Sequence, residues 1–507
     1  MTKAAPAVHS TLSQTEVRAV VIGLMLAILL GALDQTIISV ALPMMAADLQ
    51  GFDLLAWVVS GYLVAVAVAT PIYGKLGDLY GRRAMLSFAI GLFLFASVAC
   101  AMAQSMPMLV AARILQGLGG GGLISVAQAT IADVVAARDR GRFQGYISGA
   151  FAVASVSGPL AGGLLTEYLS WRWIFWINLP LGLAAFIISR RALARLPVPH
   201  VKRPVDYLGA VLLSSGLSLL LIAITRIGQG VAWGEAVNLQ LFAVALVSLA
   251  AFVWQERRAV EPIIPLALFR IPTMALCCSI LFIAFFQIVS LSVLIPLRLQ
   301  MMTDAGVEGS ALQLIPLSLA IPLGAYVGGS LTTRSGRFKR VQLSGAAMVP
   351  IAVLGLAVID PHAALLGALL MALTGIGIGL QLPTSMVAVQ NAVPHRHVGI
   401  ATAVTAFFRS LGAAVGIAIL MALLLAILHD KAPAVAGSPS GAEIIKAMVG
   451  EAGSALPTMD HALRLQLTAT VQGAFQSIFM LGALIALASV ALALRMPDEV
   501  LSERPAR

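Results

Sequence analysis

Long apolar runs occupy almost the whole chain and constrain its fold more than any other feature. Fourteen of them are long enough to cross a bilayer as a helix, which takes about 20 residues. They cover residues 18–43, 55–73, 84–104, 107–132, 143–166, 173–190, 207–226, 237–254, 273–299, 311–332, 341–359, 363–389, 398–428 and 470–494. Of the 507 residues, 60% are hydrophobic and only 11% are charged, whereas soluble domains have roughly 25% charged residues. This composition excludes a soluble enzyme, a disordered protein and a secreted disulfide scaffold, and it predicts an all-helical, polytopic membrane protein.

The Lys and Arg residues indicate how the runs are oriented. They form short clusters between the runs, so the net charge of +10 does not point to a nucleic-acid partner. If the N-terminus is cytoplasmic, 24 of the 32 fall on the cytoplasmic side and 6 on the outer side. Because basic residues are enriched in cytoplasmic loops, we predict fourteen helices in the inner (cytoplasmic) membrane with both termini in the cytoplasm. The first 17 residues show no cleavable-signal pattern, so the first run is expected to be retained.

Two basic, proline-containing stretches divide the chain into groups of six, two and six predicted helices. They are Arg190–Pro204 and Gln255–Pro272. A weak repeat supports this division, since Gly74–Arg83 and Gly329–Arg337 follow the second helix of each group of six, and many secondary transporters are built from six-helix repeats. The predicted organisation is a cytoplasmic segment 1–17, a bundle 18–190, two inserted helices with their loops 191–272, a second bundle 273–494 that includes a long outer loop 429–469, and a cytoplasmic tail 495–507.

The segment Gly74-Lys-Leu-Gly-Asp-Leu-Tyr-Gly-Arg-Arg83 is a tight loop between two predicted spans. Its glycines allow the chain to reverse direction, and its carboxylate is favoured at a helix N-terminus. The basic residues lie within reach of an acid at the base of the fourth span. We interpret the loop as a conformational latch formed by Gly74, Asp78, Gly81, Arg82, Arg83 and Asp133. The alternative is ordinary anchoring of basic residues at the inner membrane surface.

Asp34 is the only acid well inside a predicted span. An Asp near the centre of a membrane helix costs roughly 2.5–3.5 kcal/mol on insertion scales, and such a residue usually marks an ion or substrate path. We therefore predict that Asp34 binds protons and contributes to substrate binding. The alternative is a static ion pair that only fixes the packing of the helices.

Arg113 is the predicted partner of Asp34. Counted from the outer ends of their spans, Asp34 lies at a depth of about 14 Å and Arg113 at a depth of about 9 Å. Gln116 lies one turn below Arg113 and is expected to share the same network. The alternative for Arg113 is that its side chain extends to the outer membrane surface.

Arg409 lies near the middle of the thirteenth predicted span, and its own half of the chain offers no acid at that depth. Three interpretations stay open at this point. Arg409 meets Asp34 across a central cavity, or it meets one of the amide groups of Gln381, Gln390 and Asn391, or it attracts an anionic substrate.

The fifth span contains Gly158-Pro159-Leu-Ala-Gly162-Gly163. Gly158 and Gly162 form a GxxxG pattern, which allows close contact between helices, and Pro159 permits a bend. We expect this face to seal one half of the molecule against the other; a packing face without a special role is the alternative. The Gly-rich stretch Gly117–Gly122 has no preceding strand and is not interpreted as a nucleotide site. The cysteines show no metal or redox spacing.

Several segments carry a resemblance to a known family. They are Leu33–Pro43, Gly74–Arg83, Arg113–Gly119, Gly149 followed by Gly158–Gly163, Trp171–Pro180 and Phe408–Gly412. Over nearly its whole length the chain resembles the major facilitator superfamily, in particular its fourteen-helix drug:proton antiporter branch. The resemblance implies a major facilitator fold of two six-helix bundles with two helices inserted between them. It assigns Gly149, Gly158, Pro159, Gly162 and Gly163 to the helix-five signature of antiporters. The latch is degraded in the second half, where Thr333 stands at the position of an acid.

The resemblance and the membrane Asp together predict proton-coupled export of small amphiphilic or cationic compounds, as in multidrug efflux and antibiotic resistance. We expect no enzyme activity, no cofactor and no metal, with the proton gradient as the energy source. The expected partners are a small-molecule substrate and the lipid bilayer, and no nucleic acid. Two alternatives stay open: a dedicated exporter of one metabolite or antibiotic, working with a periplasmic adaptor, and a non-transporting membrane sensor.

Overall fold

The fold is built from long helices. The computed structural model describes residues 14–50, 54–135, 140–195, 206–228, 231, 233–302, 313–394, 397–436 and 461–498. The first helices are α1 (Gln14–Leu49), α2 (Leu55–Tyr80), α3 (Arg82–Ala101), α4 (Met106–Val134), α5 (Arg140–Tyr168), α6 (Trp173–Trp176), α7 (Asn178–Ala192) and the short η3 (Leu193–Arg195). They are followed by α8 (Tyr207–Gly228), α9 (Ala236–Glu256), η4 (Leu266–Arg270), α10 (Pro272–Met302), α12 (Ile315–Ser335), α13 (Phe338–Val358), α14 (Ala364–Ala392), α15 (Val398–Ala436) and α17 (His461–Leu494).

Thirteen helices in the described part of the chain are long and apolar enough to cross a membrane. Each of them corresponds to one of the fourteen spans predicted from the sequence. The remaining prediction, 143–166, lies within α5, a helix of 29 residues. The all-helical class is therefore confirmed, and the helices are consistent with fourteen crossings.

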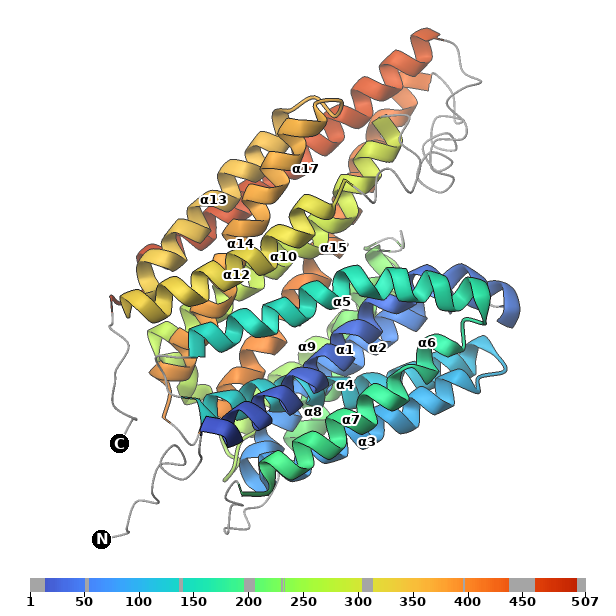
Figure 1. Ribbon diagram of the computed structural model, residues 1–507. Coiled ribbons are helices and arrows are strands. Elements are labelled where there is room, and N and C mark those ends of the chain that lie inside the picture. The colour runs from blue at the N-terminus through green and yellow to red at the C-terminus, as the bar shows by residue number, and fades with distance from the viewer. Residues whose placement is uncertain are drawn as a thin grey trace.

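The helices form two groups (Figure 1), and each group has its own apolar core. One core draws its buried residues from α1–α5, α7 and η3, and the other from α10 and the helices that follow it. The inserted helices lie beside the seam, because α8 packs on both α2 and α15. α9 packs on α8 and leaves large apolar side chains such as Leu246, Val247 and Trp254 exposed, as expected for a lipid-facing helix.

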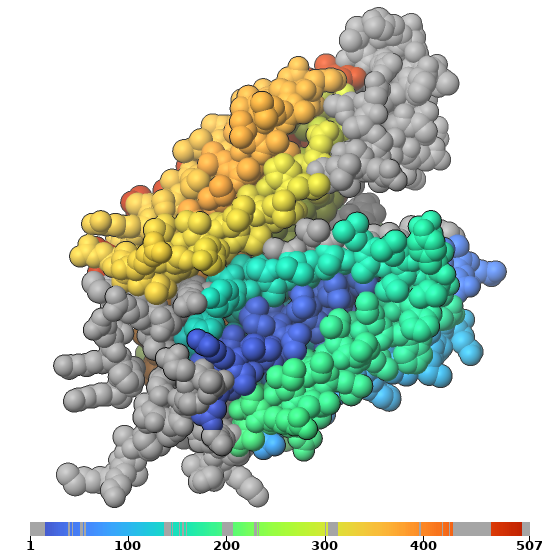
Figure 2. Space-filling view, in the orientation of Figure 1, coloured from blue at the N-terminus to red at the C-terminus, as the bar shows by residue number. Residues whose placement is uncertain are grey.

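The two groups contact each other toward one end of the molecule. We call the end where α1 begins and α17 ends the terminal end, and the opposite one the distal end (Figure 1). A buried cluster joins Ala132 of α4 to Val398 and Ile400 of α15 at the terminal end, and α5 packs along α12. In the space-filling view the two groups touch at this end and diverge toward the distal end (Figure 2).

The Gly-rich stretch of α4 packs against its neighbours. A Cβ atom on Gly119 would lie 2.7 Å from the backbone nitrogen of Phe93 in α3, and one on Gly121 would lie 2.8 Å from the carbonyl oxygen of Val66 in α2. Both distances are too short for a side chain. The stretch therefore brings three helices together, a structural reason for its glycines that needs no nucleotide.

The predicted outer loop 429–469 is partly helical at both ends. α15 continues to Ala436 and α17 already begins at His461, while residues 437–460 lie outside the described part. An apolar run marks only the part of a helix that lies in the hydrocarbon layer, and both helices extend beyond that part. The apolar spans inside these two helices, Val398–Leu428 and Thr468–Leu494, agree with the predicted spans 398–428 and 470–494.

Candidate functional site

Asp34 of α1 lies at the centre of a buried polar network. Its side chain is only 1% exposed. Oδ2 accepts a hydrogen bond from Nη1 of Arg113 at 2.7 Å, and Oδ1 accepts one each from Nε2 of Gln116 and Nδ2 of Asn178, both at 2.9 Å. Both carboxylate oxygens are therefore occupied by donors from α4 and α7.

Arg113 of α4 is held on several sides. Its side chain is 1% exposed and forms the ion pair with Asp34. Its Nη1 also donates to Oε1 of Gln116 at 2.6 Å and its Nε to the carbonyl of Val58 at 3.2 Å. The guanidinium lies 4.1 Å from the centre of the Tyr62 ring, a favourable cation–π distance. The guanidinium is thus kept inside the protein and does not extend to the membrane surface.

Gln116 connects the ion pair to α3. Its Nε2 donates to Oγ of Ser97 at 2.8 Å, and the thiol of Cys100 donates to its Oε1 at 3.6 Å. Nδ2 of Asn178 reaches the same Ser97 hydroxyl at 3.4 Å. Four helices, α1, α3, α4 and α7, therefore share one hydrogen-bonded unit, and a change of charge on Asp34 would alter bonds in all four.

The sequence did not single out Asn178, Ser97 or Tyr62. Asn178 lies inside the Trp171–Pro180 segment, and an amide within an apolar span was the available signal for it. A hydroxyl such as that of Ser97 gives little signal, because many serines in membrane helices bond to their own helix. Only the rotation of the helices reveals which of these groups face Asp34.

Arg409 of α15 stands apart from this network. It makes no hydrogen bond or ion pair with any residue that the structure describes, and its Nε is buried without a partner. Its guanidinium lies 4.4 Å from the centre of the Phe285 ring. Among the described residues, none of the expected amide partners Gln381, Gln390 and Asn391 is hydrogen-bonded to Arg409; Nε2 of Gln381 donates to the carbonyl of Gly377 and Nε2 of Gln390 to Thr402, while Oε1 of Gln381 is buried without a partner. Neither Asp34 nor these amides therefore hold Arg409 in this structure.

The predicted latch lies at the terminal end. Nε of Arg82 donates to Oδ2 of Asp133 at 2.8 Å, and Nη2 forms an ion pair with Asp78 at 2.5 Å. Asp78 in turn accepts a hydrogen bond from the backbone N–H of Ile400 in α15 at 3.1 Å. α2, α3 and α4 are thus tied together and to the second half of the molecule. Arg83 is half-buried and makes no such bond to any described residue.

Glycine is required at two positions of the latch. Gly81 separates α2 from α3 with φ 90°, a conformation that other residues rarely adopt. Gly74 packs directly against Ala403 of α15, leaving no room for a side chain. Lys75 between them forms an ion pair at 2.8 Å with Glu261, in the connection that follows α9, a contact the sequence did not predict.

These features match one family of known proteins. The sequence model of the family described as the Major Facilitator Superfamily matches residues 24–417 of the chain. The chain belongs to the major facilitator superfamily. Curated relatives of the chain are named transporters.

Two curated relatives illustrate the similarity. An uncharacterized MFS-type transporter of Mycobacterium tuberculosis is 36% identical over 409 residues, which cover 80% of this chain and 59% of that protein. The chain therefore matches less than two thirds of the length of that relative. Multidrug resistance protein 3 of Bacillus subtilis is 34% identical over 412 residues, which cover 81% of this chain and 80% of that protein.

Solved structures show the same fold at low sequence identity. The crystal structure of a human organic anion transporter is similar with a TM-score of 0.61 at 16% identity, covering 94% of this chain and 99% of that one. A proton:xylose symporter is similar with a TM-score of 0.58 at 15% identity, covering 97% and 98%. These similarities establish the major facilitator fold.

The helix-five signature of this superfamily member packs within one half of the molecule. Gly158 lies against Thr36 of α1, and Gly162 against the backbone of Ile37. The close contact predicted for GxxxG is present, and at these two glycines it joins α5 to α1. A Cβ on Gly149 would meet no atom within 4 Å, so this glycine makes no close packing contact. Gly163 is half-buried, and the side chain of Pro159 lies outside the described part.

The second half carries a weaker counterpart of the latch. Thr333 bonds to Gly329 of its own helix, and Arg337 pairs with Asp498 at 3.8 Å. The two paired side chains are 44% and 50% exposed, so solvent screens the pair. The degraded motif in the sequence therefore corresponds to a weak surface pair.

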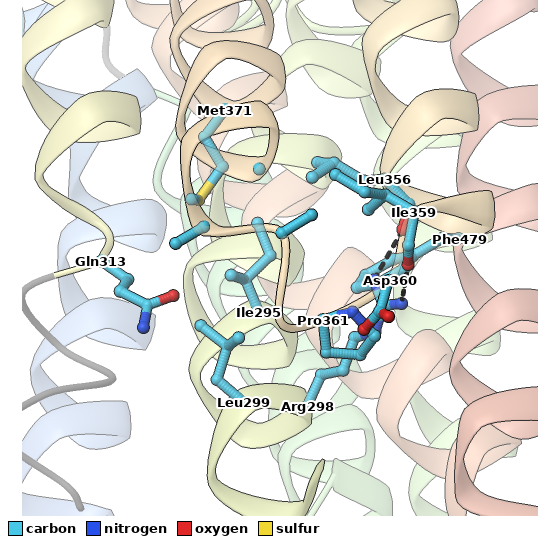
Figure 3. A pocket seen from close by; sticks show the side chains of 13 residues that line it. Ile295, Arg298, Leu299, Gln313, Leu356, Ile359, Asp360, Pro361, Met371 and Phe479 are labelled. Carbon is cyan, nitrogen blue, oxygen red and sulfur yellow. Dashed lines mark hydrogen bonds between the residues drawn. The ribbon is translucent and has the colours of Figure 1, made fainter. Parts of the chain in front are cut away.

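Arg298 of α10 is a third arginine with little exposed surface. Its Nη1 donates to the carbonyl of Leu356 at 2.6 Å and its Nη2 to that of Ile359 at 2.7 Å, which satisfies carbonyls at the end of α13. A small pocket beside it is lined mainly by apolar side chains, together with Arg298 itself, Gln313 and Asp360 (Figure 3). The guanidinium of Arg298 is thus committed to the backbone.

Proposed function

We propose that this chain exports small amphiphilic compounds across the inner membrane in exchange for protons. The observation that carries the proposal is the buried Asp34–Arg113 pair, which Gln116 and Asn178 complete within a transporter fold. An ionisable pair inside a membrane helix bundle is costly to keep, and its usual role is in an ion pathway. The names of the relatives, multidrug resistance protein 3 and multidrug transporter protein MdtP, support a drug-like substrate.

Proton exchange at Asp34 follows from its bonding partners. The ionised carboxylate accepts three hydrogen bonds and neutralises Arg113. A proton on Asp34 would remove the charge attraction and convert one acceptor into a donor. Arg113 would then retain Val58, Gln116 and the rings of Tyr62 and Phe175 as partners. Protonation would therefore rearrange α1 against α4 and α7.

The latch couples this rearrangement to the opening of the molecule. With both termini in the cytoplasm, the terminal end is the cytoplasmic side and the described conformation is closed toward the cytoplasm. Asp78, Arg82 and Asp133 stabilise that closed state through the bond from Asp78 to Ile400 of the other half. Opening toward the cytoplasm requires this bond to break.

An efflux assay in energised cells tests the proposal. A panel of lipophilic dyes, cationic, neutral and anionic, is loaded, and efflux is followed with and without a protonophore. We expect protonophore-sensitive efflux of at least one dye in the wild type and its loss in Asp34→Asn. Asp48→Asn, the same substitution near the end of the same helix, serves as the matched control and should transport like the wild type. Efflux that persists in Asp34→Asn at the wild-type rate would refute the role of Asp34.

A further inference from the structure

Arg409 differs from the other arginines that have little exposed surface. Arg82 is bonded to two carboxylates, Arg113 to Asp34, and Arg298 to two backbone carbonyls. Arg409 has no such partner among the described residues, and its Nε is buried unbonded. An arginine retained without a partner inside a membrane helix is costly, so its charge requires an explanation beyond packing.

The orientation of α15 determines where Arg409 points. Phe407 and Leu411 pack with Ala67 and Val68 of α2 at the seam between the halves. Arg409 is two residues from each, which places it about 200° around the helix. It therefore points away from this seam and toward the other helices of its own half.

The neighbours on that face are α10 and α14. Gly412 lies against the backbone of Phe282 in α10, and the hydroxyl of Thr405 lies 3.5 Å from the sulfur of Met386 in α14. Arg409, between these two residues on α15, stands over Phe285 of α10 at 4.4 Å. Arg409 as a whole is partly exposed, while its Nε is buried.

The electrostatics of the two halves favour a negatively charged ligand. Asp34 is occupied by Arg113, Gln116 and Asn178, so it offers no free negative charge to a cationic compound. Arg409 offers a free positive charge and a fork of N–H donors, which fits a carboxylate or sulfonate in two parallel hydrogen bonds. The ring of Phe285 provides an apolar surface next to that charge.

We propose that Arg409 and Phe285 form the anion-binding part of the substrate site, and that the exported compounds are amphiphilic anions. The ligand class is an apolar, preferably aromatic, body that carries one carboxylate or sulfonate. The carboxylate binds the guanidinium, and the apolar body extends along the surface beside Phe285. This inference rests on the proposed export function and names its substrate class.

Binding of three matched ligands to the purified full chain tests the inference. Naphthoate, naphthamide and naphthylmethylammonium share one ring system and differ in charge: negative, neutral and positive. Isothermal titration calorimetry in detergent gives their affinities without any ion gradient, so the result does not depend on whether protons drive transport. We expect the wild type to bind naphthoate about tenfold or more tightly than the other two, the range of a charge-assisted hydrogen bond.

Substitutions assign this preference to Arg409. In Arg409→Gln the affinity for naphthoate should fall about tenfold or more while that for naphthamide changes less than about threefold. Arg409→Lys should retain most of the preference, because it keeps the charge. Arg226→Gln is the control, since Arg226 pairs with Glu235 at the distal end of α8. Thermal unfolding of each variant shows that it is folded.

Several results would overturn the inference. In Arg409→Gln, these are an equal loss of affinity for all three ligands and an unchanged affinity for naphthoate. In the wild type, they are a higher affinity for naphthylmethylammonium than for naphthoate and a failure to bind naphthoate. None of them bears on proton coupling, which the efflux assay with Asp34→Asn measures separately.

Discussion

Arg113 and Arg409 are both arginines within membrane helices, one in each half of the molecule, and their surroundings differ sharply. Arg113 is bonded to a carboxylate, an amide and a carbonyl and is stacked on a tyrosine ring. Arg409 touches the face of a phenylalanine and has no bonded partner among the described residues. The first arrangement pairs the arginine with a carboxylate, whereas in the second the positive charge has no counter-ion among the described residues. We therefore assign proton exchange to the first half and substrate charge to the second.

The terminal end repeats this contrast between the halves. In the first half, Arg82 joins two carboxylates, one of which binds the backbone of the opposite half. In the second half, Arg337 forms a single solvent-exposed pair at 3.8 Å. An internal repeat thus preserves the loop while only one copy retains a buried network. Sequence symmetry alone does not imply functional symmetry.

Substitution of the counter-ion of Arg113 and substitution of Arg409 itself should affect the stability of the protein differently. Asp34→Ala leaves Arg113 buried without its counter-ion, and we expect a loss of about 3–5 kcal/mol in the free energy of unfolding. Arg409→Gln removes a charge that has no partner, so stability should stay the same or rise. Thermal unfolding of the purified variants in detergent measures both. Equal destabilisation by the two substitutions would show that Arg409 has a structural partner after all.

Substitutions in the two latches should differ in their effect on transport. Arg82→Gln breaks bonds to Asp78 and Asp133 and should lower the initial efflux rate about tenfold or more, because removing one partner of a buried charge pair costs several kcal/mol. Arg337→Gln removes a surface pair of about 0–1 kcal/mol and should change the rate less than about twofold. Both rates are normalised to the amount of protein in the membrane. A similar loss in both variants would contradict the asymmetry of the latches.

A small pH effect is expected at the distal end of the first half. The hydrogen bond from Arg172 to Asp48, together with one from Trp171, lowers the pKa of that carboxyl below its usual value. The resulting stabilisation is present above the unfolded-state pKa, about 4, and is lost as the pH falls through the lower folded-state value. Because the pair is partly exposed, it should contribute less than about 1 kcal/mol.

The unfolding temperatures of wild type and Asp48→Asn measured from pH 7 down to pH 3 check this expectation. The small advantage of the wild type should shrink at the acid end of this range. An advantage that grows on acidification would have the wrong sign for a carboxyl with a lowered pKa.

The sequence predicted those parts of the site that depend on charge and depth. Asp34 and Arg113 were paired because both are rare in apolar spans and lie at similar depths, and the structure places them 2.7 Å apart. Arg82 and Asp133 could be paired because a short loop brings them to the same membrane surface. The all-helical class and the positions of the spans follow from hydropathy, which is the strongest signal in such a chain.

The remaining features depend on helix rotation and neighbour choice, which hydropathy does not encode. Gly158 and Gly162 indicate close packing but not that the partner is α1. Asn178 joins Asp34 only because α7 turns that amide inward. The lack of bonded partners around Arg409 depends on where every neighbouring amide points, which no local pattern in the sequence specifies.

Transport by proteoliposomes tests the central claim, that Asp34 carries the exchanged proton, most directly. Purified wild type and Asp34→Asn are reconstituted, and two rates are measured for the same compound: net transport driven by an imposed pH gradient, and exchange of labelled for unlabelled compound without a gradient. Asn resembles a protonated Asp34 in size and charge, because it is neutral and carries one acceptor oxygen and one donor group, but it cannot exchange a proton. We predict that Asp34→Asn loses net transport and retains exchange. Net transport at the wild-type rate, or loss of both activities together, would contradict the assignment and favour a static ion pair.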